Sequence, residues 1–372
     1  MKTGSGTVHV PGQVVLVLQG GGALGAYQVG VYQALHEAGI EPDWVIGTSI
    51  GAINAALIAG NPVGDRFGRL REFWKRVEHD AAGANPLAAL TGLPNVATNL
   101  ATVVKGIPCF FTPYPPAWWG THVPLGAEAA AYYSTAPLRS TLADLLGGGR
   151  VATPRTRLTI GAVSARSGEM RYFDSRDEAL GLDHVIASGA LPPMFPAVRI
   201  GGEPYWDGGI YSNTPIEAVF NDRPRRDSVI FAVQMWNAAG PEPQTMWDVI
   251  GRQKEIQYAS RNRSHVARQQ QIHHLRRVIR ALEQKIPRRL RDTREVRDLA
   301  AWGCGTTMHI VRLAAPRLEG EDYLKDIDFT PAGIRARWRA GHRHARRALA
   351  AAPWRSAADP IEGVVVHDGP WT

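Results

Sequence analysis

The chain has 372 residues, of which 44% are hydrophobic and 20% charged, which excludes a disordered protein and fits a folded body with a sizeable core. Its net charge of +8 rests on arginine in a chain rich in Ala, Gly and Pro, and charge alone does not indicate nucleic acid, so we expect no nucleic-acid partner. Two cysteines, Cys109 and Cys304, are too few for a disulfide framework, which favours a cytoplasmic location.

Two strand, turn and helix units open the chain. Residues 14–18 are a short, wholly apolar run that ends in glycines, typical of a buried parallel strand, and residues 23–38 follow with helical spacing. Residues 44–46 repeat the pattern and lead into an Ala-rich helical stretch up to residue 59. Two successive units predict an α/β protein, a three-layer α/β/α body with a central, largely parallel sheet. No apolar run approaches the ~20 residues that span a bilayer, so any membrane contact is expected to be peripheral.

Further strands and helices follow in the second half of the chain. Apolar runs predict strands at residues 158–163, 170–173, 229–233 and 308–313. The segment 247–299 has helical spacing that Pro287 should end or kink, and a final helix should begin at Thr330. We expect one catalytic domain over residues 10–349, with a loop-rich aromatic insertion at about 82–131, an Arg-rich helical insertion at about 247–302, a C-terminal extension at about 307–349, and a tail at 350–372.

The insertion at 82–131 is rich in proline and aromatic residues and has no sustained period. Two interpretations of it are open. Its aromatic side chains form an acyl-binding mouth or lid, or they pack their own loop onto the body. The residues concerned are Phe110, Phe111, Tyr114, Trp118 and Trp119.

The segment Gly47-Thr48-Ser49-Ile50-Gly51 is the only G-x-S-x-G in the chain, and it lies between a predicted strand and a predicted helix, the context of a nucleophile elbow. Gly47 and Gly51 allow a turn too tight for Cβ atoms on either side of the serine. The following helix directs its N-terminal N–H groups at the oxygen that becomes negative during acyl transfer. The motif predicts Ser49 as a nucleophile.

The segment Gly20-Gly21-Gly22-Ala23-Leu24-Gly25 also matches G-x-G-x-x-G, which can bind a dinucleotide, bind an oxyanion, or simply form a turn. The acid that binds ribose should follow the next strand, whereas Glu41 and Asp43 precede it. Glycine N–H groups can instead form a concave anion site beside the serine. We favour this reading and expect an oxyanion loop made by Gly20, Gly21, Gly22, Ala23 and Gly25.

Trp206-Asp207-Gly208-Gly209 places an acid before two glycines that let the backbone approach a neighbouring loop. Just downstream, Thr214-Pro215-Ile216-Glu217 has the pattern of a helix capping box. Asp207 is therefore expected on a strand-to-helix connection at the same sheet edge as Ser49, where open α/β folds bind ligands. Taken alone, an Asp-Gly-Gly segment is more often an ordinary turn.

These three elements in this order resemble the patatin-like phospholipase family, over about residues 14–220. The segment from Ala187 to Pro193 is also similar to the family's small-residue and proline segment, and residues 307–349 look like an extension found in some bacterial relatives. The resemblance implies Ser49 as nucleophile, Asp207 as the base that activates it directly, and the amides around Gly21 and Gly22 as oxyanion donors. Leu24 stands where the family often has Arg or Lys, so head-group preference is not carried over.

Two arrangements of the base stay open. A Ser-Asp dyad lets the carboxylate accept the proton directly and needs a dry site that strengthens the base. A Ser-Asp-His triad would use His309, the best-placed histidine after Asp207, which is otherwise a strand residue facing the core or solvent.

The predicted reaction is cleavage of a lipid or other hydrophobic ester through an acyl-enzyme on Ser49. Hydrolysis of hydroxyalkanoate oligoesters, acyl transfer, and a non-catalytic lipid-binding scaffold are the alternatives. No zinc spacing and no phosphate-binding loop is visible, so we predict no metal and no cofactor. The final helix either contacts an anionic membrane or is a solvated helix packed by a few apolar residues; its arginines are Arg335, Arg337, Arg339, Arg343, Arg346 and Arg347.

Overall fold

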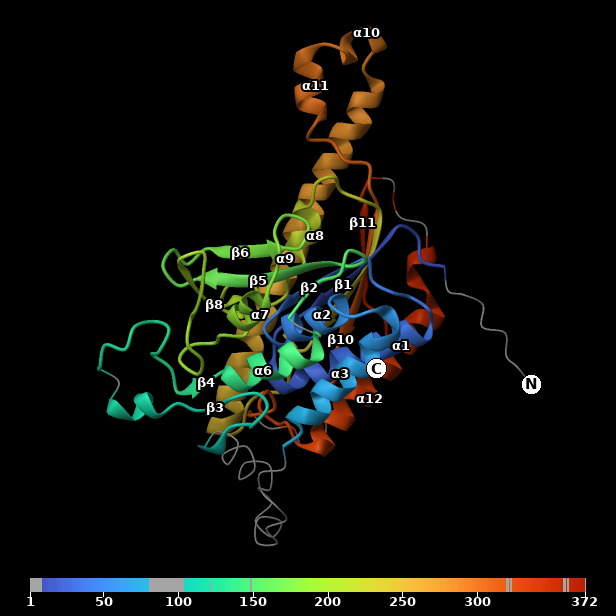
Figure 1. The fold of residues 1–372 in the computed structure, drawn as a ribbon. Coiled ribbons are helices and arrows are strands. Elements are labelled where there is room, and N and C mark those ends of the chain that lie inside the picture. Colours follow the sequence, from blue (N-terminus) through green and yellow to red (C-terminus); the bar gives the residue numbers. More distant parts are fainter. Residues whose placement is uncertain are drawn as a thin grey trace, which may run out of the picture.

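The computed structural model describes residues 9–79, 104–120, 122–147, 149–318, 321, 323–356, 359 and 361–371. The part of the predicted aromatic insertion at 82–103 lies outside the described residues. The fold is α/β, as predicted, and a mostly parallel sheet lies between helices (Figure 1).

Nine strands of the described residues form one sheet in the order β11-β10-β9-β1-β2-β5-β8-β7, with β6 paired to β5. The pairings from β11 to β5 are parallel, and those of β6, β7 and β8 are antiparallel. All six strands that were predicted from apolar runs are present. The sheet consists of β1 (Gln13–Leu18), β2 (Trp44–Thr48), β5 (Arg157–Ser164), β6 (Met170–Asp174), β7 (Val198–Ile200), β8 (Glu203–Asp207), β9 (Ser228–Gln234), β10 (Met308–Ala314) and β11 (Val364–His367), and β3 (Thr112–Pro113) pairs separately with β4 (Tyr133–Ser134).

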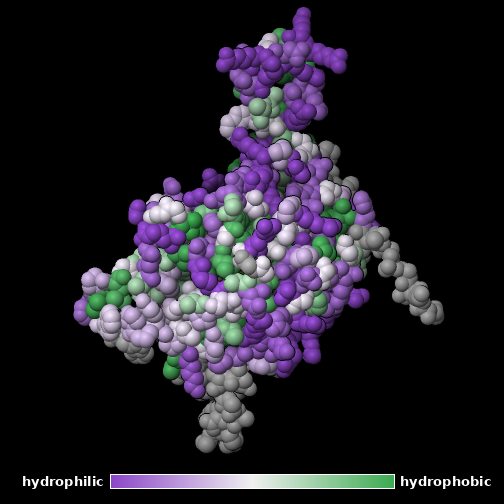
Figure 2. Space-filling view, viewed as in Figure 1, coloured by the Kyte–Doolittle hydropathy of each residue, from purple (hydrophilic) through white to green (hydrophobic). Residues whose placement is uncertain are grey.

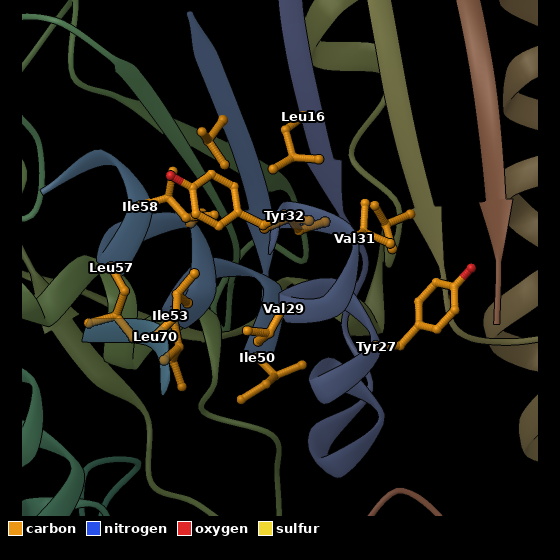
Figure 3. Close-up of a cluster of buried hydrophobic side chains, with 14 of the residues drawn as sticks. Leu16, Tyr27, Val29, Val31, Tyr32, Ile50, Ile53, Leu57, Ile58 and Leu70 are labelled. Carbon is orange, nitrogen blue, oxygen red and sulfur yellow. The ribbon is translucent and has the colours of Figure 1, made fainter. Parts of the chain in front are cut away.

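Helices cover both faces of the sheet. Alternate residues of β1 belong to two cores. Leu16 belongs to a core with α1, α2 and α3 (Figure 3), to which α12 also contributes, and Val17 belongs to a core with α8 and α9 on the other face. The helices are α1 (Ala26–Glu37), α2 (Ile50–Ala59), α3 (Val63–Val77), α6 (Ala136–Leu145), α7 (Leu182–Ser188), α8 (Glu217–Asn221), α9 (Met246–Lys285), α10 (Arg288–Arg291), α11 (Arg294–Ala300) and α12 (Pro331–Ala351), and the short 3₁₀ turns are η1 (Gly22–Gly25), η2 (Pro115–Trp119), η3 (Gly208–Ile210) and η4 (Pro353–Arg355).

Helix α9 is 40 residues long and ends one residue before Ile286-Pro287, so the predicted break at Pro287 is confirmed. The middle of the helix packs on the body through Ala259 and Val266, and its C-terminal end carries α10 and α11 on a projection from the body (Figure 1). Figure 2 shows this projection as mainly hydrophilic. Leu275 and Leu282 fit the apolar spacing of this helix but are 61% and 58% exposed. The helix still contacts the body at the fully buried His273, so Leu275 lies on its solvent side.

The C-terminal part of the chain is built into the same body. Helix α12 crosses α1 so closely that a Cβ at Gly30 would lie 2.0 Å from the Trp338 carbonyl oxygen, and one at Gly341 would lie 2.0 Å from the Tyr27 oxygen. The segment 350–372, expected as a tail, contributes β11 to the sheet. Within the described part of the chain, no helix is long and apolar enough to cross a membrane.

The predicted capping box at residues 214–217 is wrong. Helix α8 begins at Glu217, and no side chain caps its first turn. The Thr214 hydroxyl instead accepts a hydrogen bond from the Gln19 side chain at 2.8 Å, and Glu217 accepts one from the Tyr172 hydroxyl. Tertiary hydrogen bonds therefore engage both side chains that the local pattern assigned to a cap.

Candidate active site

Ser49 lies on a strained turn between β2 and α2. Its φ of 57° and ψ of −128° put it in a region that residues other than glycine rarely adopt. The two flanking glycines allow the backbone to pack closely at this turn. A Cβ at Gly47 would lie 2.3 Å from the Gly51 oxygen, and one at Gly51 would lie 2.3 Å from the Leu18 oxygen. Ser49 is partly exposed at the start of α2. This is the geometry predicted for a nucleophile elbow.

Asp207 is brought to Ser49 by the pairing of β5. On one edge of β5, Gly161 pairs with Thr48 of β2, and the next residue, Ala162, pairs with Asp207 of β8. The other edge of β5 is taken by β6, so β2 and β8 lie end to end along the same edge. Because β2 runs toward Ser49 and β8 runs toward Asp207 from the opposite direction, the two residues meet.

The Asp207 carboxylate is buried, with a residue exposure of 3%. Burial raises the pKa of Asp207 to about 7, while hydrogen bonds with the Ser49 side chain and the Gly209 N–H act in the opposite direction. The Gly209 N–H lies 2.7 Å from Oδ1. A buried carboxyl with a pKa near neutrality that lies next to a serine side chain is suited to accept a proton from it.

The glycines after Asp207 allow close packing at this junction. A Cβ at Gly208 would lie 2.5 Å from the Gly161 oxygen, so a side chain there would push β8 away from β5. A Cβ at Gly209 would lie 2.9 Å from Oδ1 of Asn213 and 3.0 Å from Oδ1 of Asp207. Both predicted motif glycines therefore lie where the turn comes closest to its neighbours.

The glycine loop passes directly beside Ser49. A Cβ at Gly20 would lie 3.0 Å from the Ser49 Cβ. The Gly20 carbonyl accepts hydrogen bonds from Asn213 Nδ2 at 3.1 Å and Trp236 Nε1 at 2.9 Å, and the Gly20 N–H donates to the Asn213 oxygen at 3.2 Å. Three hydrogen bonds thus hold the start of the loop.

The N–H groups of the loop differ in what they bind. The Gly20 N–H donates to the Asn213 carbonyl oxygen, and the Ala23 N–H donates to the Asp326 carbonyl oxygen at 2.8 Å. The Leu24 N–H donates to the Gly21 carbonyl oxygen. The N–H groups of Gly21 and Gly22 have no hydrogen-bond partner in the residues that the structure describes, and both residues are partly exposed. The donors available to an anion within the predicted loop are therefore narrowed to these two.

The remaining loop positions are packing positions. A Cβ at Gly25 would lie 2.6 Å from a side-chain carbon of Ile50, so this glycine lets η1 approach the start of α2. Leu24 is 3% exposed and belongs to the main apolar core. A basic side chain at this position would have to be buried, and its absence leaves the loop without a cation of its own.

Ser188 was not singled out by the sequence, although it lies in the small-residue segment. It is fully buried at the end of α7, accepts the Ser49 N–H at 3.0 Å and donates to the Gly161 oxygen at 2.6 Å. Gln19 was not singled out by the sequence either. Its Oε1 accepts the N–H of Trp236 at 3.2 Å, and Trp236 in turn holds the glycine loop. Only three-dimensional contacts identify these two side chains.

The histidine considered for a triad lies elsewhere. His309 pairs with Val229 near the amino end of β10, whereas Ser49 follows the carboxyl end of β2, three strands away. With ~3.3 Å per residue and ~4.8 Å per strand, the separation is on the order of 20 Å. His309 Nδ1 lies 3.0 Å from Nε2 of His367 on β11. The structure separates this histidine from the site.

The acids considered for a dinucleotide site have structural partners. Glu41 forms an ion pair with the buried Arg66 at 2.6 Å, and the Asp43 carboxylate accepts the Val14 N–H at 2.8 Å. Among the described residues, no three His, Cys, Asp or Glu side chains form a group that could hold a metal ion.

The described aromatic residues of the insertion divide into two groups. Phe110 and Phe111 pack edge to face on each other, and Phe111 is 5.0 Å from the ring of Tyr133 and 5.4 Å from that of Phe195. Trp119 is 67% exposed. The first group supports the packing interpretation, whereas the side chain of Trp118 lies outside the description.

Comparisons with known proteins show the family of the chain. A family model described as patatin-like phospholipase matches residues 16–220, and a second, described as patatin phospholipase, matches residues 256–361. The first match includes the glycine loop, the elbow and Asp207, and it covers more than half of the chain.

Similar curated proteins are much longer than the matched parts. An uncharacterized NTE family protein of Mycobacterium tuberculosis (strain ATCC 25618 / H37Rv) is 31% identical over 212 residues, which are 56% of this chain and 28% of that protein. Lysophospholipase nte1 of Aspergillus terreus is 54% identical over 65 residues, which are 17% of this chain and 4% of that protein.

Two solved structures are similar over most of the chain. VipD from Legionella pneumophila is 15% identical with a TM-score of 0.39, covering 94% of this chain and 69% of that one. ExoU in its complex with SpcU from Pseudomonas aeruginosa is 14% identical with a TM-score of 0.29, covering 94% and 73%.

Proposed function

Because the chain belongs to the patatin-like phospholipase family, we propose that it hydrolyses lipid acyl esters with Ser49 as nucleophile and Asp207 as general base. The observation that carries this proposal is the meeting of Ser49, on a strained turn, with the buried Asp207, whose pKa burial raises to about 7. The relatives named lysophospholipase and the family description support a lipid ester as substrate.

The proposed reaction has two steps, formation of an acyl-enzyme and its hydrolysis. Asp207 accepts the Ser49 hydroxyl proton as Oγ attacks the ester carbonyl, and the carbonyl oxygen becomes an oxyanion within reach of the Gly21 and Gly22 N–H groups. When the C–O bond breaks, Asp207 returns the proton to the leaving alcohol, and the acyl group remains on Ser49. Water then attacks the acyl-enzyme with Asp207 again as base, which releases the acid and restores the serine.

The test is labelling by a fluorophosphonate, followed by hydrolysis of p-nitrophenyl esters of increasing chain length. We expect Ser49→Ala to abolish labelling and both Ser49→Ala and Asp207→Asn to abolish turnover. Ser140→Ala, an exposed serine on α6, is the matched control and should behave as wild type. Folded wild-type protein that neither reacts nor turns over any ester would refute the proposal and favour the lipid-binding scaffold.

The same assay separates the alternatives within this chemistry. A preference for short hydroxyalkanoate oligomers over p-nitrophenyl esters of long fatty acids would replace the lipid substrate by an oligoester. If adding an alcohol acceptor yields a new ester and lowers the amount of free acid, the protein transfers acyl groups.

We also propose a peripheral contact with an anionic membrane through α12. The guanidinium groups of Arg335, Arg339 and Arg343 are exposed and spaced four residues apart, and they line a shallow hollow with Trp338. Among the described residues, no hydrogen bond or ion pair engages these three side chains. Like charges at this spacing repel each other along a helix, and a surface of lipid phosphates would neutralise them.

Co-sedimentation with phosphatidylcholine vesicles, with and without phosphatidylserine, tests this contact. We expect binding that requires phosphatidylserine, falls with salt, and is lost when the three arginines are changed to Gln. Changing Arg288, Arg289 and Arg291 of α10 to Gln is the matched control. Equal loss in both triple variants would mean that net charge, and not the α12 face, is responsible.

A further inference from the structure

The glycine loop touches a segment about 300 residues further along the chain. The Ala23 N–H donates to the Asp326 carbonyl oxygen at 2.8 Å. Gly22 has a φ of +55°, and a Cβ at this position would lie 2.2 Å from the same oxygen. No other residue type fits at position 22 while this contact is made. We name residues 325–329 the strap.

The strap is fastened to α9 by two consecutive ion pairs. Lys254 Nζ lies 3.0 Å from both carboxylate oxygens of Asp326, and Lys325 Nζ lies 2.5 Å from Glu255 Oε1. Lys325 and Glu255 are buried, with residue exposures of 8% and 9%. Two adjacent residues of the helix therefore bind two adjacent residues of the strap, which fixes both the position and the direction of its backbone.

Both ends of the strap are anchored next to the glycine loop. At one end, the Lys325 ammonium lies 5.6 Å from the ring centre of Trp236, whose Nε1 donates to the Gly20 oxygen at 2.9 Å. At the other end, Phe329 stacks on Trp74 with ring centres 6.2 Å apart. The strap cannot shift along the loop without breaking one of these contacts.

We propose that the strap and its two ion pairs to α9 position the oxyanion donors of the site, which assigns a catalytic purpose to the C-terminal part of the chain. Asn213 takes the Gly20 N–H and Asp326 takes the Ala23 N–H, so the two amides between them are held free. Lys254 and Asp326 act through the loop and do not touch substrate. The inference rests on the proposed function, because it deepens the role of the same glycine loop.

The expected effect is large because oxyanion stabilisation depends on accurate placement. Removing an oxyanion donor typically lowers kcat by about 100-fold or more, and a displacement of about 1 Å can have a similar effect. Loosening one of the two ion pairs should displace the loop only part of the time. We therefore expect Lys254→Met and Asp326→Asn each to lower kcat by about 10-fold, with KM changed by less than about twofold.

The experiment combines two measurements on the full chain. Hydrogen exchange followed by mass spectrometry measures the protection of peptides that span Gly20 to Leu24, and ester hydrolysis measures kcat and KM. We expect faster exchange and lower kcat in Lys254→Met and Asp326→Asn, and recovery of both in Lys254→Arg. Arg76→Met is the matched control, because Arg76 is 32% exposed in an ion pair with Asp144, close to the 33% of Lys254 in its pair.

The two measurements separate failure of this inference from failure of the proposed function. Unchanged exchange in both variants overturns the strap as a positioning device, whether or not the protein is an esterase. Faster exchange with wild-type kcat overturns the catalytic role alone. If the wild type hydrolyses no ester but the variants exchange faster, the strap still supports the loop. The proposed esterase activity and the catalytic role of the strap are then both refuted.

Discussion

Ser49 and Ser188 are joined by a hydrogen bond of 3.0 Å from the Ser49 N–H to the Ser188 hydroxyl oxygen. The Ser188 hydroxyl in turn donates to the Gly161 oxygen at 2.6 Å, so one buried hydroxyl satisfies the elbow and β5 together. The Ser49 N–H is therefore engaged and not available to an oxyanion, which is consistent with the proposal that the glycine loop supplies oxyanion donors.

Ser188→Ala should destabilise the protein by about 1–3 kcal/mol, because it leaves a buried donor and a buried acceptor without a partner. The strained elbow would also lose its support, so kcat should fall several-fold. Urea unfolding and ester hydrolysis measure the two effects, with the exposed Ser140→Ala as control. Equal stability of the two variants would show that the bond contributes nothing.

The activity should depend on pH through Asp207. Only the ionised carboxylate can accept the serine proton, and burial raises the pKa of Asp207 to about 7. The value of kcat/KM should therefore rise about tenfold per pH unit below pH 7 and level off above it. A profile that is flat from about pH 5 to pH 8 would be incompatible with Asp207 as the base.

The same carboxyl should limit stability. The pKa of Asp207 in the folded protein lies above its ordinary value of 3.8. The free energy of unfolding is therefore highest below about pH 4, where the carboxyl is protonated in both states, and it falls as pH rises through about 7. Asp207→Asn, which cannot ionise, should be more stable than wild type at pH 8 by up to about 4 kcal/mol, and the gain should vanish near pH 4.

Thermal unfolding across this pH range is the measurement for Asp207→Asn. Asp177→Asn, in an ion pair at the surface, is the control and should show no such gain. A loss of stability in Asp207→Asn at every pH would mean that the charged carboxylate supports the fold.

Gly22→Ala should lower kcat by about 10- to 100-fold, because its Cβ would collide with the Asp326 oxygen and displace the loop. Gly168→Ala is a close control, since Gly168 also has a positive φ, of +73°, but a Cβ there meets nothing within 4 Å. Both variants should lose about 1–2 kcal/mol of stability from the left-handed backbone. Loss of activity in both would point to global destabilisation.

His309→Ala should retain full esterase activity, because His309 is paired with His367 and lies on the order of 20 Å from Ser49. Measuring kcat/KM of this variant against wild type decides between the dyad and the triad. A loss of more than about tenfold in a folded variant would bring the triad back.

The parts of the fold that were predicted correctly depend on local patterns. The wholly apolar run at residues 14–18 needs only its own residues to be read as a buried strand, and the glycines around Ser49 report a tight turn directly. The order of such units along the chain then indicated a parallel sheet. Local patterns thus predicted the architecture and the turn at Ser49, whereas Asp207 was singled out as its partner by the resemblance to the patatin-like phospholipase family.

What could not be predicted depends on contacts between distant segments. Thr214 fits a helix cap by its neighbours, yet a glutamine 195 positions away binds its hydroxyl. Asp326 carries no motif at all, and its contact with Ala23 is made by a backbone oxygen that any residue possesses. Leu275 has the spacing of a buried residue, but it lies on the solvent side of α9.

The end-to-end arrangement of β2 and β8 has a consequence for the order in which the protein can become active. Ser49 precedes the β5 edge in the chain, but its proposed base follows on β8, a strand that ends at residue 207 and pairs with the same edge of β5. During synthesis the proposed nucleophile is therefore made before its base, and the two are brought together only after β8 has paired with β5. The proposed ester hydrolysis therefore depends on long-range strand pairing, which forms late compared with local structure such as the Ser49 turn.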